Sequence, residues 1–215
     1  MGRAAVKKHN QDSEISLSEK LDAMFSLPEH LSGEFYNGEL LAVPRPGYPH
    51  QYAGGGIFGD LCGFFMRRSG GGEKGWVFIQ DVLINHPKWQ NPRAPDISGW
   101  RKHRPPKLKK IKTNKSTYTL SETIPDWVCE ILSPSTAGID LKEKKPEYGE
   151  AGIKYLWLVD PVNQYIRSFR RKTRKRKETE DWWKELGCYV GDEKARIEPF
   201  EELELDLSLL WFREE

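Results

Sequence analysis

Residues 126–152, DWVCEILSPSTAGIDLKEKKPEYGEAG, decide the fold, because a nearly continuous apolar run is followed by a helical pattern that ends at Gly152. The next residues, IKYLWLVDP, form a second apolar run. Continuous apolar runs of this length are typical of strands that are covered on both faces. A strand, a helix and a second strand in this order favour parallel pairing of the two strands. The stretch therefore predicts an α/β unit.

A single carboxylate, Glu130, interrupts the first apolar run between Cys129 and Ile131. An ionised side chain that is buried without a partner costs roughly several kcal/mol. We therefore expect Glu130 to have a cation, a hydrogen-bonding network or a shifted pKa. A structural salt bridge with an arginine is the alternative, but a carboxylate amid apolar neighbours is more typical of a functional site.

The helical pattern after this strand carries a lysine on its inner face. Asp140, with Glu143 three residues later, predicts a capping box that opens the helix. Pro146 would bend such a helix, which favours a start nearer Lys145. On a repeat of about 3.6 residues, one face collects Leu141, Lys144, Tyr148 and Ala151. Lys144 is thus expected near the end of the Glu130 strand, although a lysine that snorkels from the helix edge explains the pattern equally well.

A second carboxylate, Asp96, lies in the segment APDISGW, after a turn-rich stretch that ends a strand candidate over residues 76–85. Pro95 favours extended geometry before it, so Asp96 is expected near the beginning of a short strand. Mg²⁺ prefers oxygen ligands and keeps several waters, and Asp96, Glu130 and the backbone carbonyl of Ile131 would satisfy it. Lys144 beside such an ion could orient or deprotonate a water and offset negative charge.

Six sequence features follow one another in a fixed order: EFYNGEL, His50, APD, DWVCEILSPST, Lys144 with Tyr148, and GIKYLWLVDP. This ordered set, from about residue 32 to residue 169, resembles the Uma family of restriction endonucleases, a bacterial branch of the PD-(D/E)XK nuclease superfamily. The resemblance implies a restriction-endonuclease-like α/β (α+β) fold, a mixed central sheet flanked by helices, and Mg²⁺- or Mn²⁺-dependent hydrolysis of DNA. It also implies that Asp96 is the PD aspartate and Glu130 the acidic residue of the (D/E)XK element.

The chain departs from the superfamily pattern where the strand lysine should stand, because Leu132 occupies that position. The resemblance implies that Lys144 serves instead from the following helix. Glu34 aligns with an acidic residue that reaches the metal directly or through water, and His50 matches a histidine at a helix start. Tyr148 is better explained as a core residue than as a catalytic one.

Composition limits the remaining possibilities. With 215 residues, of which 37% are hydrophobic, the chain can bury one sizeable core and has no break in composition. We expect a flexible segment over residues 1–15 and a single domain over residues 16–215. The three cysteines have no paired spacing, which argues against a disulfide framework or a zinc site and favours a cytoplasmic protein. No run approaches the roughly 20 apolar residues that cross a bilayer.

Shorter patterns organise the rest of the chain. An amphipathic helix is predicted over residues 16–30 with Leu17, Leu21 and Met24 inward, followed by a hairpin at Asn37 and Gly38. Residues 50–68 have helical spacing, and we expect their glycines to serve close packing against the sheet or a partner. A closing β segment is predicted over residues 187–211.

Two basic runs without acids, residues 101–115 and 170–177, are candidates for contact with a phosphate backbone. The alternative is a solvated loop, which we favour for the second run. The first run joins the strands of Asp96 and Glu130, so a loop there is expected to lie across the mouth of the site. The leading hypothesis is an endonuclease acting on DNA, and a homodimer would let it cut both strands. The alternatives are an inactive DNA-binding or assembly module and a nuclease acting on RNA or branched DNA.

Overall fold

A computed structural model describes residues 15–36, 38–66, 75–87, 89, 91–134, 137–174 and 181–213. The segment predicted to be flexible, residues 1–15, lies outside these ranges apart from Ile15, as do Asn37 at the predicted hairpin turn and residues 175–177 of the second basic run. Within the described ranges, no helix is long and apolar enough to span a membrane.

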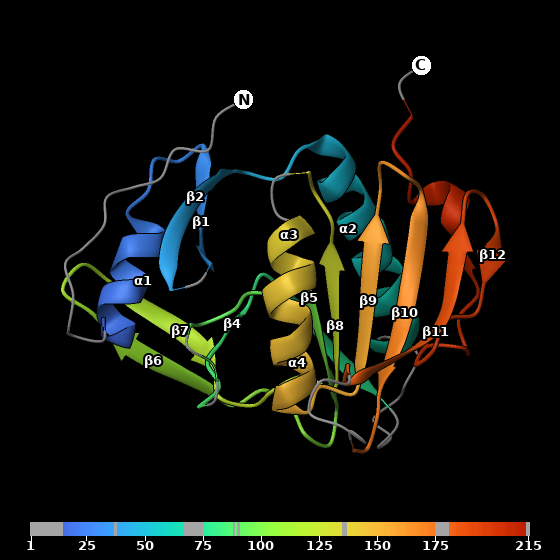
Figure 1. The fold of residues 1–215 in the computed structure, drawn as a ribbon. Helices are drawn as coiled ribbons and strands as arrows, with labels where there is room; N and C mark the ends of the chain where they lie inside the picture. The colour runs from blue at the N-terminus through green and yellow to red at the C-terminus, as the bar shows by residue number, and fades with distance from the viewer. Residues whose placement is uncertain are drawn as a thin grey trace.

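A mixed sheet forms the centre of the molecule, as the sequence predicted (Figure 1). Within the described residues it has six strands in the order β11-β10-β9-β8-β5-β3. Their bounds are β3 Trp76–Gln80, β5 Ile97–Arg101, β8 Trp127–Ile131, β9 Tyr155–Asp160, β10 Tyr165–Arg171 and β11 Trp183–Val190. Strands β8 and β9 run parallel, and the other neighbours pair antiparallel. The predicted strand-helix-strand unit is therefore confirmed.

Helices cover both faces of this sheet (Figure 1). Helix α2 (Tyr48–Leu61), which continues into the π-helical turn η1 (Cys62–Met66), packs on one face with Cys129 and Ile131 of β8. Helix α4 (Lys145–Ala151) lies on the other face, where its residue Tyr148 belongs to the same hydrophobic cluster as Val128 and Leu132. Successive side chains of a strand point to opposite faces. Glu130 shares the parity of Val128, so it points to the α4 face.

Aromatic side chains fill the core on the α2 face. The ring of Phe200 lies within 5.5 Å of five other aromatic rings of the described residues, measured between centroids. These rings belong to Phe65, Trp76, Phe78, Trp127 and Trp157. The C-terminal segment that carries Phe200 contains β12 (Lys194–Ala195), β13 (Leu205–Asp206) and the 3-10 helix η3 (Leu207–Leu209). Strands β12 and β13 pair with each other, which confirms the predicted closing β segment.

The glycines of α2 fulfil the expected packing role only in part. A Cβ on Gly54 would lie 2.9 Å from Ile131 Cδ1, and one on Gly56 would lie 2.8 Å from Leu210 Cδ2. Nothing described lies within 4 Å of a Cβ built on Gly55, Gly59 or Gly63. The prediction is thus confirmed for two glycines, whereas the other three are exposed, and for them packing against a partner stays a prediction.

A smaller unit packs beside the central sheet (Figure 1). It consists of α1 (Leu17–Phe25), the hairpin of β1 (Leu31–Tyr36) with β2 (Glu39–Pro44), and a sheet in the order β4-β7-β6. The bounds of that sheet are β4 Leu83–Ile84, β6 Leu108–Lys112 and β7 Thr117–Ser121. Leu21, Leu83 and Leu120 form its core, with Leu17 and Met24 packed against them, so the predicted inner face of α1 is confirmed.

Two strand predictions need correction in this region. The candidate strand over residues 76–85 is split, because Asp81 has a positive φ of 49° and turns the chain from β3 into β4. A left-handed backbone of this kind cannot continue a strand. The basic run over residues 101–115 is not a plain loop, since it contains β6, which pairs antiparallel with β7.

The helix after β8 begins earlier than predicted. Ala137–Ile139 form the short helix α3, and Asp140–Lys144 form a π-helical turn, η2, that leads into α4. Asp140 is therefore buried inside the helical stretch, and the predicted capping box is wrong. A π turn inserts a residue and shifts the helical phase, which leaves Leu141 40% exposed while Asp140 points inward. Gly152, with a φ of 95°, ends the helix as predicted.

Candidate active site

Two neighbouring strands place Asp96 and Glu130 side by side. Strands β5 and β8 are antiparallel with Ile97 opposite Cys129, so Asp96 at the start of β5 lies level with Glu130. The carboxylate of Asp96 accepts a hydrogen bond from the amide of Ile131 at 2.6 Å. His50, the third residue of α2, places Nε2 3.3 Å from the other oxygen of Asp96. The fold thus brings together one wall of the predicted site.

Lys144 supplies the cation that buried Glu130 requires. Its Nζ lies 3.3 Å from Glu130 Oε2, 2.8 Å from Asp140 Oδ1 and 2.6 Å from Glu34 Oε1. Tyr148, one turn further along the helix, donates its hydroxyl hydrogen bond to Glu130 Oε1. Lys144, Glu130 and Asp140 have almost no exposed side-chain surface, at 5%, 2% and 2%. These residues come from β1, β8, η2 and α4.

Glu34, Glu130 and Asp140 share this one ammonium, and the pKa values of Glu130 and Asp140 are raised. Burial, together with the charges of Asp140 and Asp96, raises the pKa of Glu130 well above its usual range, although Lys144 and Tyr148 oppose the rise. The pKa of Asp140 rises to about 6 for the same reason, burial first and the charge of Glu34 next, against the opposing effect of Lys144. Burial alone would lower the pKa of Lys144, but the carboxylates of Asp140, Glu130 and Glu34 raise it well above its usual value. Lys144 is therefore a firmly protonated cation.

The histidine side of the site holds a further carboxylate. Burial and the charge of Asp96 raise the pKa of Asp81, whose backbone amide donates to the Asp96 carbonyl at 3.3 Å. Burial would lower the pKa of His50, but its hydrogen bond with Asp96 and the charges of Asp96, Asp140 and Asp81 raise it. A positively charged imidazole is thus favoured next to this group of acids.

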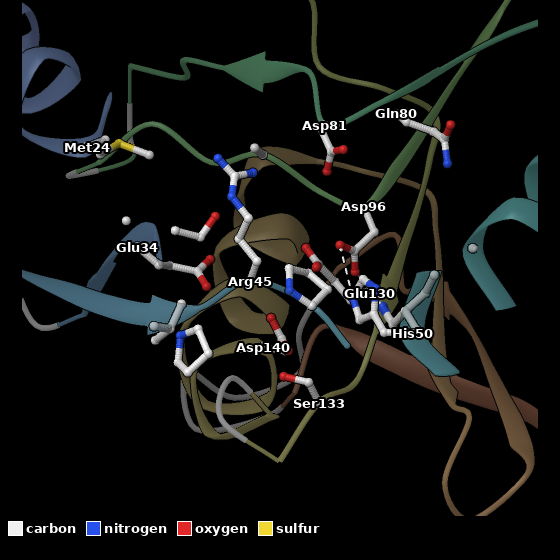
Figure 2. A pocket seen from close by; sticks show the side chains of 18 of the residues that line it. Met24, Glu34, Arg45, His50, Gln80, Asp81, Asp96, Glu130, Ser133 and Asp140 are labelled. Carbon is white, nitrogen blue, oxygen red and sulfur yellow. Dashed lines mark hydrogen bonds and ion pairs between the residues drawn. The ribbon is translucent and has the colours of Figure 1, made fainter. Parts of the chain in front are cut away.

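Apart from Tyr148, which lies behind Glu130, these side chains line one cavity of about 590 Å³ (Figure 2). Its walls come from β1, β2, the start of α2, the segment around Asp81 and the end of β8. In Figure 2, Arg45 extends across the cavity between Glu34 and Asp81. The smaller unit also contributes to the lining of the cavity, with Met24 and Phe25 of α1.

Sequence reasoning missed three charged residues of this cavity: Arg45, Asp81 and Asp140. Asp81 interrupts the apolar pattern of residues 76–85, which is the same signal that identified Glu130. Asp140 precedes Lys144 by four residues, a spacing typical of helical ion pairs, but it resembled a helix cap. Arg45 follows a strand without a distinguishing pattern, so its sequence context carries no such signal.

The donor set fits a hard dication that takes few ligands from the protein and keeps several waters. Among the described residues, no three His, Cys, Asp or Glu side chains form a group that could hold a metal ion by themselves. Asp96, Glu130 and a backbone carbonyl leave room for retained waters, which is how Mg²⁺ usually binds. Five carboxylates line the cavity against Lys144, His50 and Arg45. A dication would relieve this excess of negative charge.

A mixed sheet flanked by helices, with strand carboxylates and a lysine around one cavity, is the architecture of the restriction-endonuclease-like fold class. The chain matches the Uma2 family, described as "Putative restriction endonuclease", over residues 19–208, and it belongs to this family. It is similar in structure to a crystal structure described as "a putative nuclease belonging to DUF820" from Anabaena variabilis ATCC 29413. The TM-score is 0.61 at 21% identity, over 89% of this chain and 97% of that chain, which confirms the fold. No curated protein gives a significant match.

Proposed function

We propose that this protein is a metal-dependent endonuclease that hydrolyses phosphodiester bonds in DNA. The observation that carries the proposal is the convergence of Asp96, Glu130 and Lys144 on one wall of the cavity. Asp96, Glu130 and the carbonyl of Ile131 would hold Mg²⁺ or Mn²⁺. Such an ion would polarise the phosphodiester and lower the pKa of a bound water.

The remaining side chains have distinct tasks in this proposal. Lys144 stays protonated, so it orients the attacking water and offsets negative charge on the reacting phosphate instead of acting as a base. Tyr148 and Lys144 together favour the ionised form of Glu130, which is the form that binds a cation. His50 holds the carboxylate of Asp96 in place from α2. Glu34 anchors Lys144 from the opposite side of the cavity.

A basic face beside the cavity supports DNA as the partner. On the hairpin of β6 and β7, Lys110 lies opposite Thr119 and Lys112 opposite Thr117, and all four side chains are exposed. Ammonium and hydroxyl groups are the usual contacts of a phosphate backbone. The ring of Tyr118 on the same hairpin stacks on Phe25 at 4.8 Å, and Phe25 lines the cavity. The Tyr118 face of the hairpin is thus the one nearer the cavity, and Lys110 and Lys112 lie on its opposite face.

The test is cleavage of supercoiled and linear DNA by purified protein with Mg²⁺, Mn²⁺ or a chelator. We expect cleavage that requires metal and falls at least about a hundredfold in Glu130→Gln and Lys144→Ala. Matched controls are Glu185→Gln and Lys145→Ala, which alter the same residue types in surface ion pairs. These controls should cut like the wild type.

Two results would contradict the proposal. Cleavage that survives chelation, or that persists in folded Glu130→Gln, would remove the metal mechanism. DNA binding that ignores the metal, with no cleavage of any DNA substrate, would favour an inactive binding or assembly module. Single-stranded RNA and branched DNA belong in the same substrate panel, and light scattering of the same preparation tests the proposed homodimer.

A further inference from the structure

Arg93 is a buried arginine whose guanidinium joins three segments behind the cavity. Its side chain is only 1% exposed. Nη1 donates to the carbonyl of Phe35 at 2.7 Å, and Nη2 donates to Glu143 Oε2 at 3.0 Å. Nε and Nη2 grip the two carboxylate oxygens of Glu147 at 2.7 and 3.1 Å. The planar fork of arginine matches such a bidentate contact, which a lysine cannot form.

The partners of Arg93 stand next to cavity residues along the chain. Phe35 follows Glu34, Glu143 precedes Lys144, and Glu147 precedes Tyr148. Each hydrogen bond of Arg93 therefore fixes the backbone or the turn that carries one of the groups around Glu130. Arg93 itself touches none of the cavity groups through these bonds.

The backbone of Arg93 is as firmly held as its side chain. Its amide donates to the carbonyl of Ile84 at 3.0 Å, and its carbonyl accepts from the amide of Ile84 at 2.7 Å. This bridge lies three residues before Asp96. Because both its backbone and its guanidinium are hydrogen-bonded, Arg93 can hold the β1–β2 hairpin and the helical stretch at a fixed position relative to β4.

We propose that Arg93 is a positioning residue that holds Glu34 and Lys144 in register with Glu130. The proposal rests on the proposed function for its kinetic test, but its structural test is independent of catalysis. Without the guanidinium of Arg93, no hydrogen bond of this residue joins Phe35 of β1 to Glu143 of η2. Lys144 then loses its contact with Glu34, the one carboxylate around it that comes from the smaller unit.

The first measurement is the rate at which an amine-acylating reagent labels Lys144, read by mass spectrometry of the folded protein. In the wild type Lys144 is 4% exposed and held by three carboxylates, so labelling should be slow. In Arg93→Lys we expect labelling of Lys144 to rise at least about tenfold relative to Lys145, its neighbour in the same helix. Glu147→Gln should give a smaller rise in the same direction.

Arg171→Met is the matched control, because Arg171 also donates to this helix, at the carbonyl of Gly149, and lies over the ring of Trp182. It should lower the melting temperature without exposing Lys144. Slow labelling of Lys144 in folded Arg93→Lys and Glu147→Gln would overturn the proposal, as would equal exposure in Arg171→Met. If Arg93→Lys does not fold, Glu147→Gln decides the question by the same measurement.

The second measurement is steady-state cleavage of DNA. In Arg93→Lys we expect kcat to fall at least about tenfold with KM for DNA within about threefold, because misplaced groups harm the reaction more than the binding. Arg171→Met should keep kcat within about twofold. A loss confined to KM, or an equal kcat loss in Arg171→Met, would contradict a positioning role. If the wild type cuts no DNA, the proposed function fails while the labelling result still decides the role of Arg93.

Discussion

Glu130 is stabilised by different partners on its two oxygens. Oε1 accepts from the hydroxyl of Tyr148, and Oε2 faces the ammonium of Lys144. The first bond fixes the plane of the carboxylate, and the second supplies charge. The sequence predicts Tyr148 as a core residue, and it is indeed fully buried, but its hydroxyl also binds the cavity residue Glu130.

Tyr148→Phe should separate these two contributions. The ring remains packed, but one oxygen of a buried carboxylate loses its donor, which costs about 1–3 kcal/mol. We expect urea unfolding to show a loss of this size and DNA cleavage to fall about tenfold. Tyr165→Phe, which removes a hydroxyl hydrogen-bonded to Asp160, is the control. A Tyr148→Phe protein as stable and active as the wild type would show that the hydroxyl has no such role.

The π-helical turn η2 is the element that assembles the lysine cluster. It directs Asp140 and Lys144 inward together and leaves Pro146 in the first turn of α4, where a missing amide hydrogen costs little. The helical period of the sequence correctly gave the inward direction of Lys144 and Tyr148. It could not give the π turn, because that turn depends on the buried ion pair between Asp140 and Lys144, whose partners also include Glu34 from a distant strand.

Asp126 connects three elements at the opposite end of β8. Its buried carboxylate accepts from the amide of Arg101 and pairs with Arg104 and Lys154, each at 3.0 Å. Burial alone would raise its pKa, but these three partners lower it below the usual value. The contact fixes the ends of β5 and β9 against β8.

Asp126→Asn should therefore destabilise the protein in a pH-dependent manner. The folded-state pKa of Asp126 is lowered, so its stabilising contribution is present above the unfolded value of about 4 and disappears as the pH falls through the lower folded value. We expect the variant to lose about 2 kcal/mol at pH 7 and to approach the wild type near pH 3, in urea unfolding at both values. Asp192→Asn, in an exposed pair with Arg213, is the control. A difference that does not shrink in acid would contradict this account.

At the scale of the whole molecule, residues of both the central sheet and the smaller unit line the cavity. The central sheet and its helices carry Asp96, Glu130 and Lys144, and the smaller unit carries Glu34 and the basic face of β6 and β7. A DNA that contacts both this face and the cavity would pass around the edge of the hairpin, because Ile111 and Tyr118 on the other face pack against α1.

The double variant Lys110→Gln with Lys112→Gln tests that path. Each phosphate contact adds roughly one to the slope of log affinity against log salt concentration. We expect weaker DNA binding and a slope reduced by about one to two, measured by fluorescence anisotropy from low to moderate salt. Lys184→Gln with Lys194→Gln, on β11 and β12 at the far end of the central sheet, should leave the slope unchanged. An equal effect of both double variants would indicate a general charge effect.

Local patterns predict the central sheet, helix α1 and the β1–β2 hairpin, but they do not predict the sheet of β4, β7 and β6 in the smaller unit. Strand β8, the helical stretch that ends at Gly152 and strand β9 follow each other in the chain. The periodicity of the sequence is therefore sufficient to predict this unit. The parallel pairing of β4 with β7 joins Leu83 to Leu120 and depends on packing against α1, which no local pattern records. For the same reason Asp96, Glu130 and Lys144 were found as candidates, whereas the contact of Lys144 with Glu34 was not anticipated.

The chain leaves the central sheet after Arg101 and returns at Asp126, and the amide of Asp126 donates to the carbonyl of Gly99 at 2.8 Å. Everything between these points, including the basic hairpin, is an excursion whose ends nearly touch. The entropy of closing such a loop rises only with the logarithm of its length, about 0.6 kcal/mol for each doubling. Evolution could therefore lengthen, shorten or recharge this arm at little thermodynamic cost while the strands that carry Asp96 and Glu130 stay unchanged.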